Sequence, residues 1–449
     1  MCNMLELVMS RSMRIKGKAN INGILRIPGD KSISHRVAML ASIARGVSRV
    51  TNFATSVDCH TTLDCVERLG VRVRRGPQEI LIHGEGLNGY RPVETPARLN
   101  AGNSGSTIRM LSGILAGQPF TSITDGDRSL GRRPLRRIIE PLTLMGAQVR
   151  AREGNYTPLE IEGGRLRAIN YASSVASAQV KTCVLFAGLY ADGRTVFAEP
   201  APSRDHTELI LEEFGARFEV DETNGSLSIT GGSELTAVDY RVPGDMSSAA
   251  FFIAAATLLP DSQLELKDVN LNPSRTAFVD VLGQLGANVL ISNLRTVHRE
   301  LVADIRVTSS QLKSESQGTV LSGNIIPNLI DEIPILAIVA TQVEGRIEVR
   351  EARELRIKES DRVQTVVAGI RALGGHIEEF EDGFAVCGPQ KLTGGRVETE
   401  GDHRIAMAFS IAALMADGTT EIVDADSAGV SFPEFYQLLK SLVGEGHIE

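Results

Sequence analysis

A short pattern recurs six times along the sequence: an apolar residue, then Gly, then an alternating apolar segment. The copies are Leu69-Gly70-Val71-Arg72-Val73, Met145-Gly146-Ala147-Gln148-Val149, Phe214-Gly215-Ala216-Arg217-Phe218, Leu285-Gly286-Ala287-Asn288-Val289, Leu373-Gly374-Gly375-His376-Ile377 and a degenerate Val443-Gly444. Each copy predicts an amphipathic helix that ends at a glycine cap and is followed by a strand. Successive glycines are 69 to 88 residues apart, and self-similarity at such a spacing predicts six similar structural units.

A second set of segments recurs in step with the first. These segments are rich in small residues, are apolar on nearly every side, and begin near Ser32, Ser104, Ser177, Ser247, Asp331 and Asp402. All but the fourth end at or near a glycine (Gly46, Gly117, Gly193, Gly345 and Gly418), and the fourth runs into Pro260. Because a helix that is apolar all round is buried, we expect an α/β fold. Each unit should pair one buried helix with one surface helix and several strands.

The two halves of the chain begin with the same short sequence motif. Ile27-Pro28-Gly29-Asp30-x-Ser32 returns 215 residues later as Val242-Pro243-Gly244-Asp245-x-Ser247. We therefore expect two pseudo-threefold domains, 29–242 and 1–28 plus 243–449. A hinge is expected near Pro28 and Pro243, because Pro-Gly interrupts regular structure. The first strand should belong with the C-terminal half.

Composition excludes several classes of partner. The formal net charge of −8 argues against nucleic acid and anionic membranes, which attract broad positive surfaces. No window reaches the roughly 18 apolar residues of a spanning helix, and the apolar stretch 4–9 is too short for a signal peptide. We expect a cytoplasmic protein that binds neither nucleic acid nor membrane. Nothing indicates a coiled coil or an interaction tail, so we expect a monomer.

The cysteines and histidines do not indicate a metal site. The cysteines, Cys2, Cys59, Cys65, Cys183 and Cys387, are odd in number and form no C-x-x-C pair, so neither a disulfide framework nor a zinc ribbon is supported. The eight histidines are dispersed without ligand spacing. We expect no metal and no cofactor.

Polar segments open several of the predicted buried helices: Gly29-Asp30-Lys31-Ser32, Gly102-Asn103-Ser104-Gly105-Ser106, Ser173-Ser174 and Gly401-Asp402-His403-Arg404. The free N–H groups of a helix start favour anions, although Ser, Asp and Asn are also ordinary N-caps. Basic residues lie at or beside these starts, namely Lys31, Arg36, Arg109, Lys181 and Arg404. A cation that is buried without a partner is costly, so a bound anion would explain them.

Further arginines lie in the predicted loops 125–134, 202–206 and 353–362. Arginine suits bidentate binding of carboxylate and phosphate. For Arg128, Arg132, Arg353 and Arg356 we predict instead solvated ion pairs with neighbouring charges.

Eight segments together resemble the 5-enolpyruvylshikimate-3-phosphate synthases, in the family's order and spacing from about Pro28 to Pro433: PGDKSISHR, GNSGSTIRML, SAQVK, RDHTE, PGDMSS, IDEIP, RIKESDR and GDHRIAMAF. The resemblance implies two globular halves, each a threefold repeat of a βαβαββ unit (an inside-out α/β barrel), that close over the substrates. It implies transfer of the enolpyruvyl group of phosphoenolpyruvate to the 5-hydroxyl of shikimate 3-phosphate, with release of phosphate. This is a step of chorismate and aromatic amino acid biosynthesis.

The resemblance also assigns residues to each substrate. For shikimate 3-phosphate they are Lys31, Ser32, Arg36, Ser177, Ala178, Gln179, Arg204, Asp331 and Lys358. For phosphoenolpyruvate they are Lys31, Asn103, Gly105, Arg133, Gln179, Arg362 and Arg404. The reaction places a proton on the methylene carbon while the 5-hydroxyl loses one, which calls for general acid–base catalysis. We expect Asp331 to handle the hydroxyl proton and Glu359 or Lys31 to serve the methylene carbon.

Two features depart from the family's pattern. Val430 stands where some members carry a lysine that contacts phosphoenolpyruvate. The motifs SAQVK, RDHTE and GDMSS resemble the branch often tolerant of glyphosate, a phosphoenolpyruvate mimic, and tolerance is therefore predicted. Against it, Ser274 replaces that branch's usual Thr, and Gly105 stands where some tolerant members have Ala.

Other hypotheses stay open at this point. The UDP-N-acetylglucosamine enolpyruvyl transferases share the fold and the donor but commonly use a loop cysteine, whereas Cys59, Cys65 and Cys183 lie in predicted helices. The segment 84–89 fits the nucleotide-binding pattern G-x-G-x-x-G, but Tyr-Arg-Pro follows it instead of a helix, which favours a turn. A non-catalytic scaffold would keep the repeats but would have no need of Asp331 and Glu359.

Overall fold

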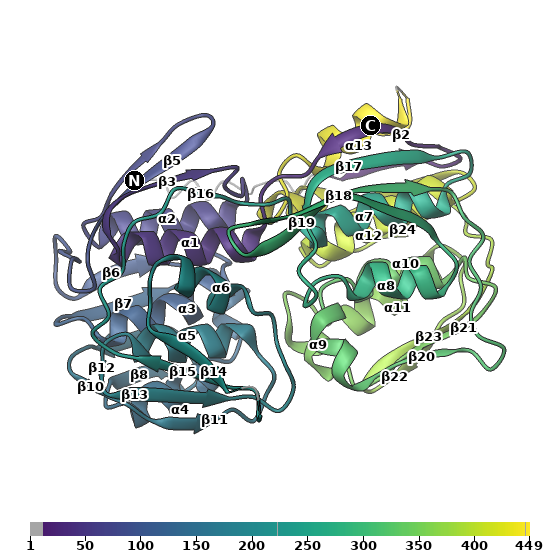
Figure 1. Ribbon diagram of the computed structural model, residues 1–449. Coiled ribbons are helices and arrows are strands. Elements are labelled where there is room, and N and C mark those ends of the chain that lie inside the picture. Colours follow the sequence, from purple (N-terminus) through teal and green to yellow (C-terminus); the bar gives the residue numbers. More distant parts are fainter. Residues whose placement is uncertain (1–11, 222, 445) are drawn as a thin grey trace, which may run out of the picture.

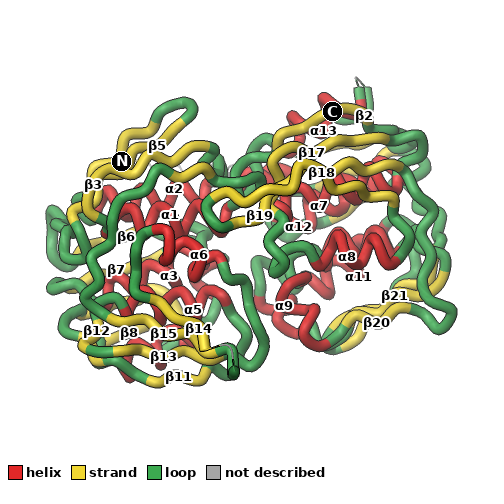
Figure 2. Tube along the Cα trace, viewed as in Figure 1, coloured by secondary structure: helices red, strands yellow, loops and turns green. Residues whose placement is uncertain are grey.

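The computed structural model describes residues 12–221, 223–444 and 446–449 of the chain. Figure 1 shows two globular halves side by side, with the chain passing between them. Figure 2 shows that strands lie mainly on the outside of each half and helices mainly inside. Cys2 and the apolar stretch 4–9 lie outside the described residues.

Within the described residues, six buried helices form the centres of the two halves. They are α1 (Lys31–Ile43), α3 (Gly105–Ala116), α5 (Ala178–Gly188), α7 (Met246–Leu258), α10 (Ile333–Ala340) and α12 (His403–Met415). All of α10 is buried. Small residues let these helices approach closely, since a Cβ on Gly113 of α3 would lie 2.2 Å from the carbonyl oxygen of Cys183 in α5. The prediction of buried helices at these six places is confirmed.

The second helix of each unit lies nearer the surface and ends at the recurrent glycine. These helices are α2 (Val57–Arg68), α4 (Arg136–Leu144), α6 (His206–Glu213), α8 (Ala277–Gln284), α11 (Arg362–Ala372) and α13 (Phe435–Val443). The six glycines that follow them have φ between 76° and 104°, a region that glycine enters without steric cost. The repeated apolar-Gly pattern is therefore a helix end, as predicted. A short helix α9 (Ile326–Leu329) and the 3₁₀ turns η1 (Leu130–Arg132), η2 (Gly323–Ile325), η3 (Arg353–Ile357) and η4 (Ala425–Val430) complete the described helices.

One pairing pattern recurs in the sheets of the described residues. In each four-stranded sheet an edge strand runs parallel to the second strand, and the remaining pairs are antiparallel; the orders are β16-β3-β5-β4, β6-β7-β9-β8, β11-β13-β15-β14, β2-β17-β19-β18 and β20-β21-β23-β22. A three-stranded sheet β24-β25-β1 begins in the same way, and β10 pairs with β12.

The strands in these sheets are two to ten residues long. Their bounds are β1 Met13–Lys16, β2 Asn22–Arg26, β3 Arg45–Thr51, β4 Arg72–Arg75, β5 Glu79–Glu85, β6 Ala97–Asn100, β7 Thr121–Asp125, β8 Gln148–Arg152, β9 Tyr156–Glu162, β10 Leu166–Arg167, β11 Asn170–Ala172, β12 Ala191–Asp192, β13 Arg194–Ala198, β14 Phe218–Asp221, β15 Ser226–Thr230, β16 Tyr240–Arg241, β17 Gln263–Asn270, β18 Asn288–Val297, β19 Glu300–Thr308, β20 Thr319–Leu321, β21 Gly345–Val349, β22 Glu378–Phe380, β23 Gly383–Gly388, β24 Arg396–Val397 and β25 Thr419–Ile422. The segment after β5 is a turn, as predicted for 84–89.

The chain passes between the halves twice, and the two passing segments lie side by side. β1 and β2 pair with β25 and β17, whereas β16 pairs with β3. Asp30 N donates to Pro243 O at 2.8 Å, and Asp245 N donates to Pro28 O at 3.0 Å. Gly29 is required here, because a Cβ would lie 1.8 Å from the carbonyl oxygen of Asn52. One apolar core lies within 33–242, and the other combines 13–27 with 246–448.

A buried arginine ties these passing segments together. Arg275 Nη2 lies 3.1 Å from Asp245 Oδ1 and 3.8 Å from Asp30 Oδ2. Each aspartate also caps a helix, since Asp30 accepts from Ile33 N and Asp245 accepts from Ser247 N. Arg275 therefore connects the first turn of α1 with the first turn of α7.

In the part of the chain that the structure describes, no single helix has the length and apolar character needed to cross a membrane. One bent pair, Gly323–Leu329 with Ile333–Ala340, meets the length and composition criteria together, with 107° between the two helices.

Candidate active site

A polar cavity lies between the two halves, and the starts of the buried helices border it. The predicted substrate and catalytic residues that line it are Lys31, Ser32, Arg36, Gly105, Arg133, Ser177, Ala178, Gln179 and Arg204 from the N-terminal half, and Asp331, Lys358, Glu359, Arg362 and Arg404 from the C-terminal half. Asn103 is the one predicted site residue that is not part of this lining. The repeats thus bring together residues that are up to 373 positions apart.

Two arginines at this cavity are buried and form no ion pair among the described residues. Arg36 donates from Nε to Thr207 Oγ1 at 2.6 Å and from Nη1 to Ser32 O at 2.8 Å. Arg109 donates from Nη1 to Gln179 Oε1 at 2.9 Å. Burial lowers the pKa of Arg36 to about 10 and, together with the charge of nearby arginines, that of Arg109 to about 9. A bound anion would supply the missing negative charge to both.

Asn103 contacts Arg133, which lines the cavity. Arg133 Nη2 donates to Asn103 Oδ1 at 2.7 Å, and its Nη1 lies 3.0 Å from Glu359 Oε1. Gly105 leaves room for this arginine and its neighbour, because a Cβ there would come within 2.6 Å of Arg109 Nη1. Asn103 is therefore placed to orient a cation at the cavity.

Asp331 lies among three cations. Arg204 Nη2 is 2.6 Å from Asp331 Oδ2, while Arg404 Nε and Arg362 Nη1 are each 3.6 Å from Oδ1. Burial raises the pKa of Asp331, but the charges of Arg404 and Arg204 outweigh it and hold that pKa well below its usual range. The carboxylate is thus ionised at neutral pH, the state that a general base needs.

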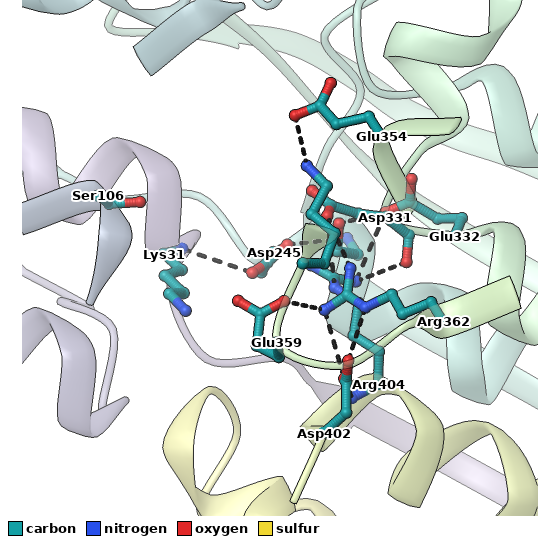
Figure 3. A network of polar contacts seen from close by, with 12 residues as sticks. Lys31, Ser106, Asp245, Asp331, Glu332, Glu354, Glu359, Arg362, Asp402 and Arg404 are labelled. Atoms are coloured by element: carbon teal, nitrogen blue, oxygen red, sulfur yellow. Dashed lines mark hydrogen bonds and ion pairs between the residues drawn. The ribbon is translucent and has the colours of Figure 1, made fainter. Parts of the chain in front are cut away.

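Glu359 is held by arginines from both halves. Besides Arg133, it contacts Arg362 Nη2 at 2.6 Å, and Arg362 Nε is in turn held by Asp402 Oδ2 at 2.8 Å; Figure 3 shows both carboxylates directed at this guanidinium. Burial raises the pKa of Glu359, but Arg362 and Arg133 outweigh it, so its pKa stays well below the usual value. In the ligand-free protein Glu359 carries no proton to donate at neutral pH.

Lys31, unlike Asp331 and Glu359, is protonated at neutral pH. Its ammonium forms an ion pair with Asp58, a buried carboxylate in the first turn of α2. Burial lowers the pKa of Lys31, but the charge of Asp58 and its hydrogen bond outweigh burial, and the pKa is raised above the ordinary value. Lys31 is therefore a protonated group at the first residue of α1, beside the cavity.

Carboxylates of the C-terminal half pair with arginines of the N-terminal half across the cavity. The pairs are Arg133–Glu359, Arg204–Asp331 and Arg137–Glu354, the last at 3.4 Å. Lys358 contacts Glu354 at 3.0 Å. Because these carboxylates occupy the cations, an anionic substrate must compete with them.

Several residues of the site were not predicted to bind a substrate or to act in catalysis. Those that line the cavity are Asp58, Arg137, Asp245, Arg275, Glu354 and His403, and Asp402 contacts Arg362 behind the lining. Glu354 precedes Lys358 by four residues, and Asp402 opens α12 as its N-cap. The sequence shows the four-residue spacing of Glu354 and Lys358 and the N-cap at Asp402. Ordinary helices have the same spacing and the same cap, so neither feature indicates a site.

One basic residue that was expected to bind an anion instead forms ion pairs with carboxylates of the protein. Lys181 is buried, and its ammonium contacts Glu208 at 2.7 Å and Glu199 at 3.1 Å. The expectation that a bound anion explains Lys181 is therefore wrong, because two carboxylates already neutralise it. Arg353 and Arg356 form the predicted ion pairs near the surface, with Glu381 for the former, and with Asp361 and Glu379 for the latter. Val430 ends η4 and does not line the cavity.

The cysteines in the described residues are buried in helices, except Cys387. Cys59 and Cys65 lie in α2 and Cys183 lies in α5, as predicted. Burial raises the pKa of all three thiols, that of Cys65 to about 12, which makes them poor nucleophiles. Within the same residues, no group of three or more His, Cys, Asp and Glu side chains could hold a metal ion.

His403 at the start of α12 should make stability depend on pH. Burial lowers its pKa to about 3, whereas an unfolded histidine has a pKa of about 6.5. Between these values only the unfolded chain binds the proton, so stability falls as the pH falls through this window. From pH 7 to pH 5 His403 should cost about 2 kcal/mol.

His403→Asn should therefore lose about 2 kcal/mol less stability than wild type between pH 7 and pH 5. Urea unfolding at the two pH values measures this difference. His376→Asn, at an exposed position, is the matched control and should behave as wild type. Equal losses in wild type and His403→Asn would contradict the prediction.

A family model connects this geometry with known proteins. The model described as EPSP synthase (3-phosphoshikimate 1-carboxyvinyltransferase) matches residues 15–439. The chain belongs to the EPSP synthase family. The resemblance inferred from the eight sequence segments is thereby confirmed.

Relatives within the EPSP synthase family match over almost their whole length. A 3-phosphoshikimate 1-carboxyvinyltransferase from Solibacter usitatus is 51% identical over 96% of this chain and 99% of its own, and one from Koribacter versatilis is 47% identical over 96% and 99%. The solved EPSP synthase of Acinetobacter baumannii has a TM-score of 0.85, is 38% identical, and is matched over 98% of this chain and 99% of its own. The enolpyruvyl transferase NikO of Streptomyces tendae, at 16% identity, a TM-score of 0.77 and 98% coverage of both chains, shares the mixed α/β fold.

Proposed function

We propose that the chain transfers the enolpyruvyl group of phosphoenolpyruvate to the 5-hydroxyl of shikimate 3-phosphate and releases phosphate, a step of chorismate and aromatic amino acid biosynthesis. The observation that carries the proposal is that a group able to accept a proton and a group able to donate one line the same cavity. Asp331 is ionised and Lys31 is protonated, and cations for two anionic substrates surround them. Family membership and the names of the relatives support the same reaction.

We assign the two substrates to different sets of cations. Arg36, with Lys31, Ser32, Ser177, Ala178, Gln179, Arg204, Asp331 and Lys358, would bind shikimate 3-phosphate. Lys31, Gly105, Arg133, Gln179, Arg362 and Arg404 would bind phosphoenolpyruvate, and Asn103 would act by orienting Arg133. Arg36 has no carboxylate partner among the described residues, so it suits the phosphate of the sugar. Arg133 and Arg362 would exchange Glu359 for the donor's anionic groups.

The protonation states divide the acid and base roles. Asp331 would accept the 5-hydroxyl proton as the sugar oxygen attacks C2 of phosphoenolpyruvate, while Lys31 would donate a proton to its methylene carbon. The resulting tetrahedral intermediate would then lose phosphate, which leaves with the proton held by Asp331, and a proton from the new methyl group would return to Lys31 as the enol ether forms. The electrostatic field of the arginines would stabilise the negative charge throughout. Of the two candidates for the methylene carbon, Lys31 is favoured over Glu359, because only Lys31 carries a proton in the ligand-free site.

We also propose that 29–242 and 1–28 plus 243–449 are two domains that close about a hinge near Pro28 and Pro243. Separate apolar cores and the double passage of the chain support this. Each domain would be an inside-out α/β barrel with three units around a pseudo-threefold axis. The recurring sheet order and the central helices support that description.

Phosphate release tests the function directly. Purified protein should release phosphate from phosphoenolpyruvate with shikimate 3-phosphate and should not do so with UDP-N-acetylglucosamine, the acceptor of the other enolpyruvyl transferases. Release only with the sugar nucleotide would overturn the proposal, and no release with either acceptor would indicate a non-catalytic scaffold. Adding glyphosate to the same assay tests the predicted tolerance, which inhibition at micromolar concentration would contradict.

A further inference from the structure

Lys181 makes three contacts that join separate segments bordering the cavity. Its ammonium contacts Glu208 of α6 at 2.7 Å, Glu199 at 3.1 Å and the carbonyl oxygen of Ser203 at 3.1 Å. An ammonium has three N–H donors, so Lys181 has none left for a substrate. Only 2% of its side chain is exposed. Its role in the site must therefore be indirect.

The first consequence of these contacts concerns the loop that carries Arg204. Glu199 Oε1 accepts from Lys181 and also from Ser203 N at 2.8 Å. Ser203 is therefore held at both its carbonyl and its amide, immediately before Arg204. Arg204 in turn reaches Asp331 in the other half. Lys181 and Glu199 together hold the backbone of the residue before Arg204, and so restrict where the Arg204 side chain can lie.

The second consequence concerns Arg36. Thr207, next to Glu208 on α6, accepts from Arg36 Nε at 2.6 Å. Glu208 is the carboxylate whose charge acts most strongly on Arg36, yet it is paired with Lys181. Without Lys181, Glu208 would be a buried carboxylate without its partner, and Arg36 would be the neighbouring cation available to it. Such a pair would occupy the guanidinium that an anion needs.

We propose that Lys181 is a positioning residue for the phosphorylated sugar: it holds the Arg204 loop and keeps Glu208 away from Arg36, so that Arg36 stays available to a phosphate. This inference rests on the proposed function for the identity of the sugar phosphate. It explains why a lysine buried on α5 is needed close to the site but outside the cavity lining. It also predicts an effect on one substrate and not on the other.

The test uses the full chain and the variant Lys181→Met. The dissociation constant of shikimate 3-phosphate, measured by calorimetry, should rise by about ten- to hundredfold, the size of a lost charged hydrogen bond. The KM for phosphoenolpyruvate at saturating shikimate 3-phosphate should change by less than about threefold. Lys181→Met/Glu208→Gln should recover the part of the affinity that is lost through Glu208, because the amide carries no charge to pair with Arg36.

Lys267→Met is the matched control. Lys267 on β17 also bridges two carboxylates, Glu265 at 2.8 Å and Asp304 at 2.9 Å, but neither of them lines the cavity, whereas Ser203, which Lys181 contacts, does. The loss of Lys267 should leave the affinity for shikimate 3-phosphate unchanged. Lys181→Gln, which keeps hydrogen-bond donors, serves as a second variant if Lys181→Met does not fold.

The possible outcomes separate the inference from the proposed function. Normal affinity for shikimate 3-phosphate in a folded Lys181→Met or Lys181→Gln variant would overturn the inference, and so would equal weakening for both substrates. If Lys181→Met and Lys181→Met/Glu208→Gln bound shikimate 3-phosphate equally weakly, the claim that Lys181 keeps Glu208 away from Arg36 would be overturned. If wild type itself neither bound shikimate 3-phosphate nor released phosphate with it, the proposed function would fail instead.

Discussion

Asp331→Asn should lower kcat by about 10²- to 10⁴-fold, the usual contribution of a general base, while shikimate 3-phosphate still binds. Asparagine is close to aspartate in shape but cannot accept the 5-hydroxyl proton. The cations that surround Asp331 in the ligand-free protein, Arg204 and Arg404, remain free to bind the substrates. Steady-state phosphate release and calorimetric binding of shikimate 3-phosphate measure the two quantities separately.

Glu332→Gln is the matched control for this variant. Glu332 is the neighbouring buried carboxylate, but it accepts a hydrogen bond from Ser247 and does not line the cavity. Its kcat should stay within about threefold of wild type, because glutamine can still accept a hydrogen bond from Ser247. Near-normal turnover of Asp331→Asn would show that another group accepts the hydroxyl proton.

Lys31→Met should cause a loss of kcat/KM for phosphoenolpyruvate of at least about 10²- to 10⁴-fold, the range for removal of a general acid. Loss of the cation should add to this through weaker binding of the donor. Initial rates at varied phosphoenolpyruvate, with shikimate 3-phosphate saturating, measure the effect.

This substitution also leaves Asp58 buried without its partner, which is destabilising on its own. The variant Lys31→Met/Asp58→Asn removes that charge and should regain thermal stability while staying inactive. If it regained turnover as well, the loss in Lys31→Met would have come from the unpaired carboxylate. Lys31 would then not be the acid.

The order of the elements could be predicted from the sequence because it depends on local patterns. A helix without a polar face must be buried, and this holds for α7 and α10 whatever surrounds them. The glycine after each second helix is needed for a local backbone conformation with positive φ. The eight motifs also contain most of the residues that line the cavity, because each motif stands at a helix start or in the loop before it.

The partners of these residues could not be predicted, since they are distant in sequence. Arg133 and Glu359, which are 226 positions apart, meet only because two halves face each other. The same holds for Arg275 with Asp30. Lys31 meets Asp58 through the packing of α1 against α2 within one half. In the sequence Lys181 and Arg36 looked alike, as cations on apolar helices. In the structure Lys181 contacts two carboxylates, and Arg36 contacts hydroxyl and carbonyl groups.

The sequence by itself determined the six units, their buried helices and the list of charged residues at the helix starts, because these follow from local periodicity, capping and composition. Only the tertiary structure decided which charges neutralise one another and, through that, which groups carry a proton. The physical reason is that the pKa of a buried group depends on burial and on charges within a few ångströms, and those neighbours come from distant parts of the chain. The proposal of Asp331 as base and Lys31 as acid therefore rests on the folded arrangement.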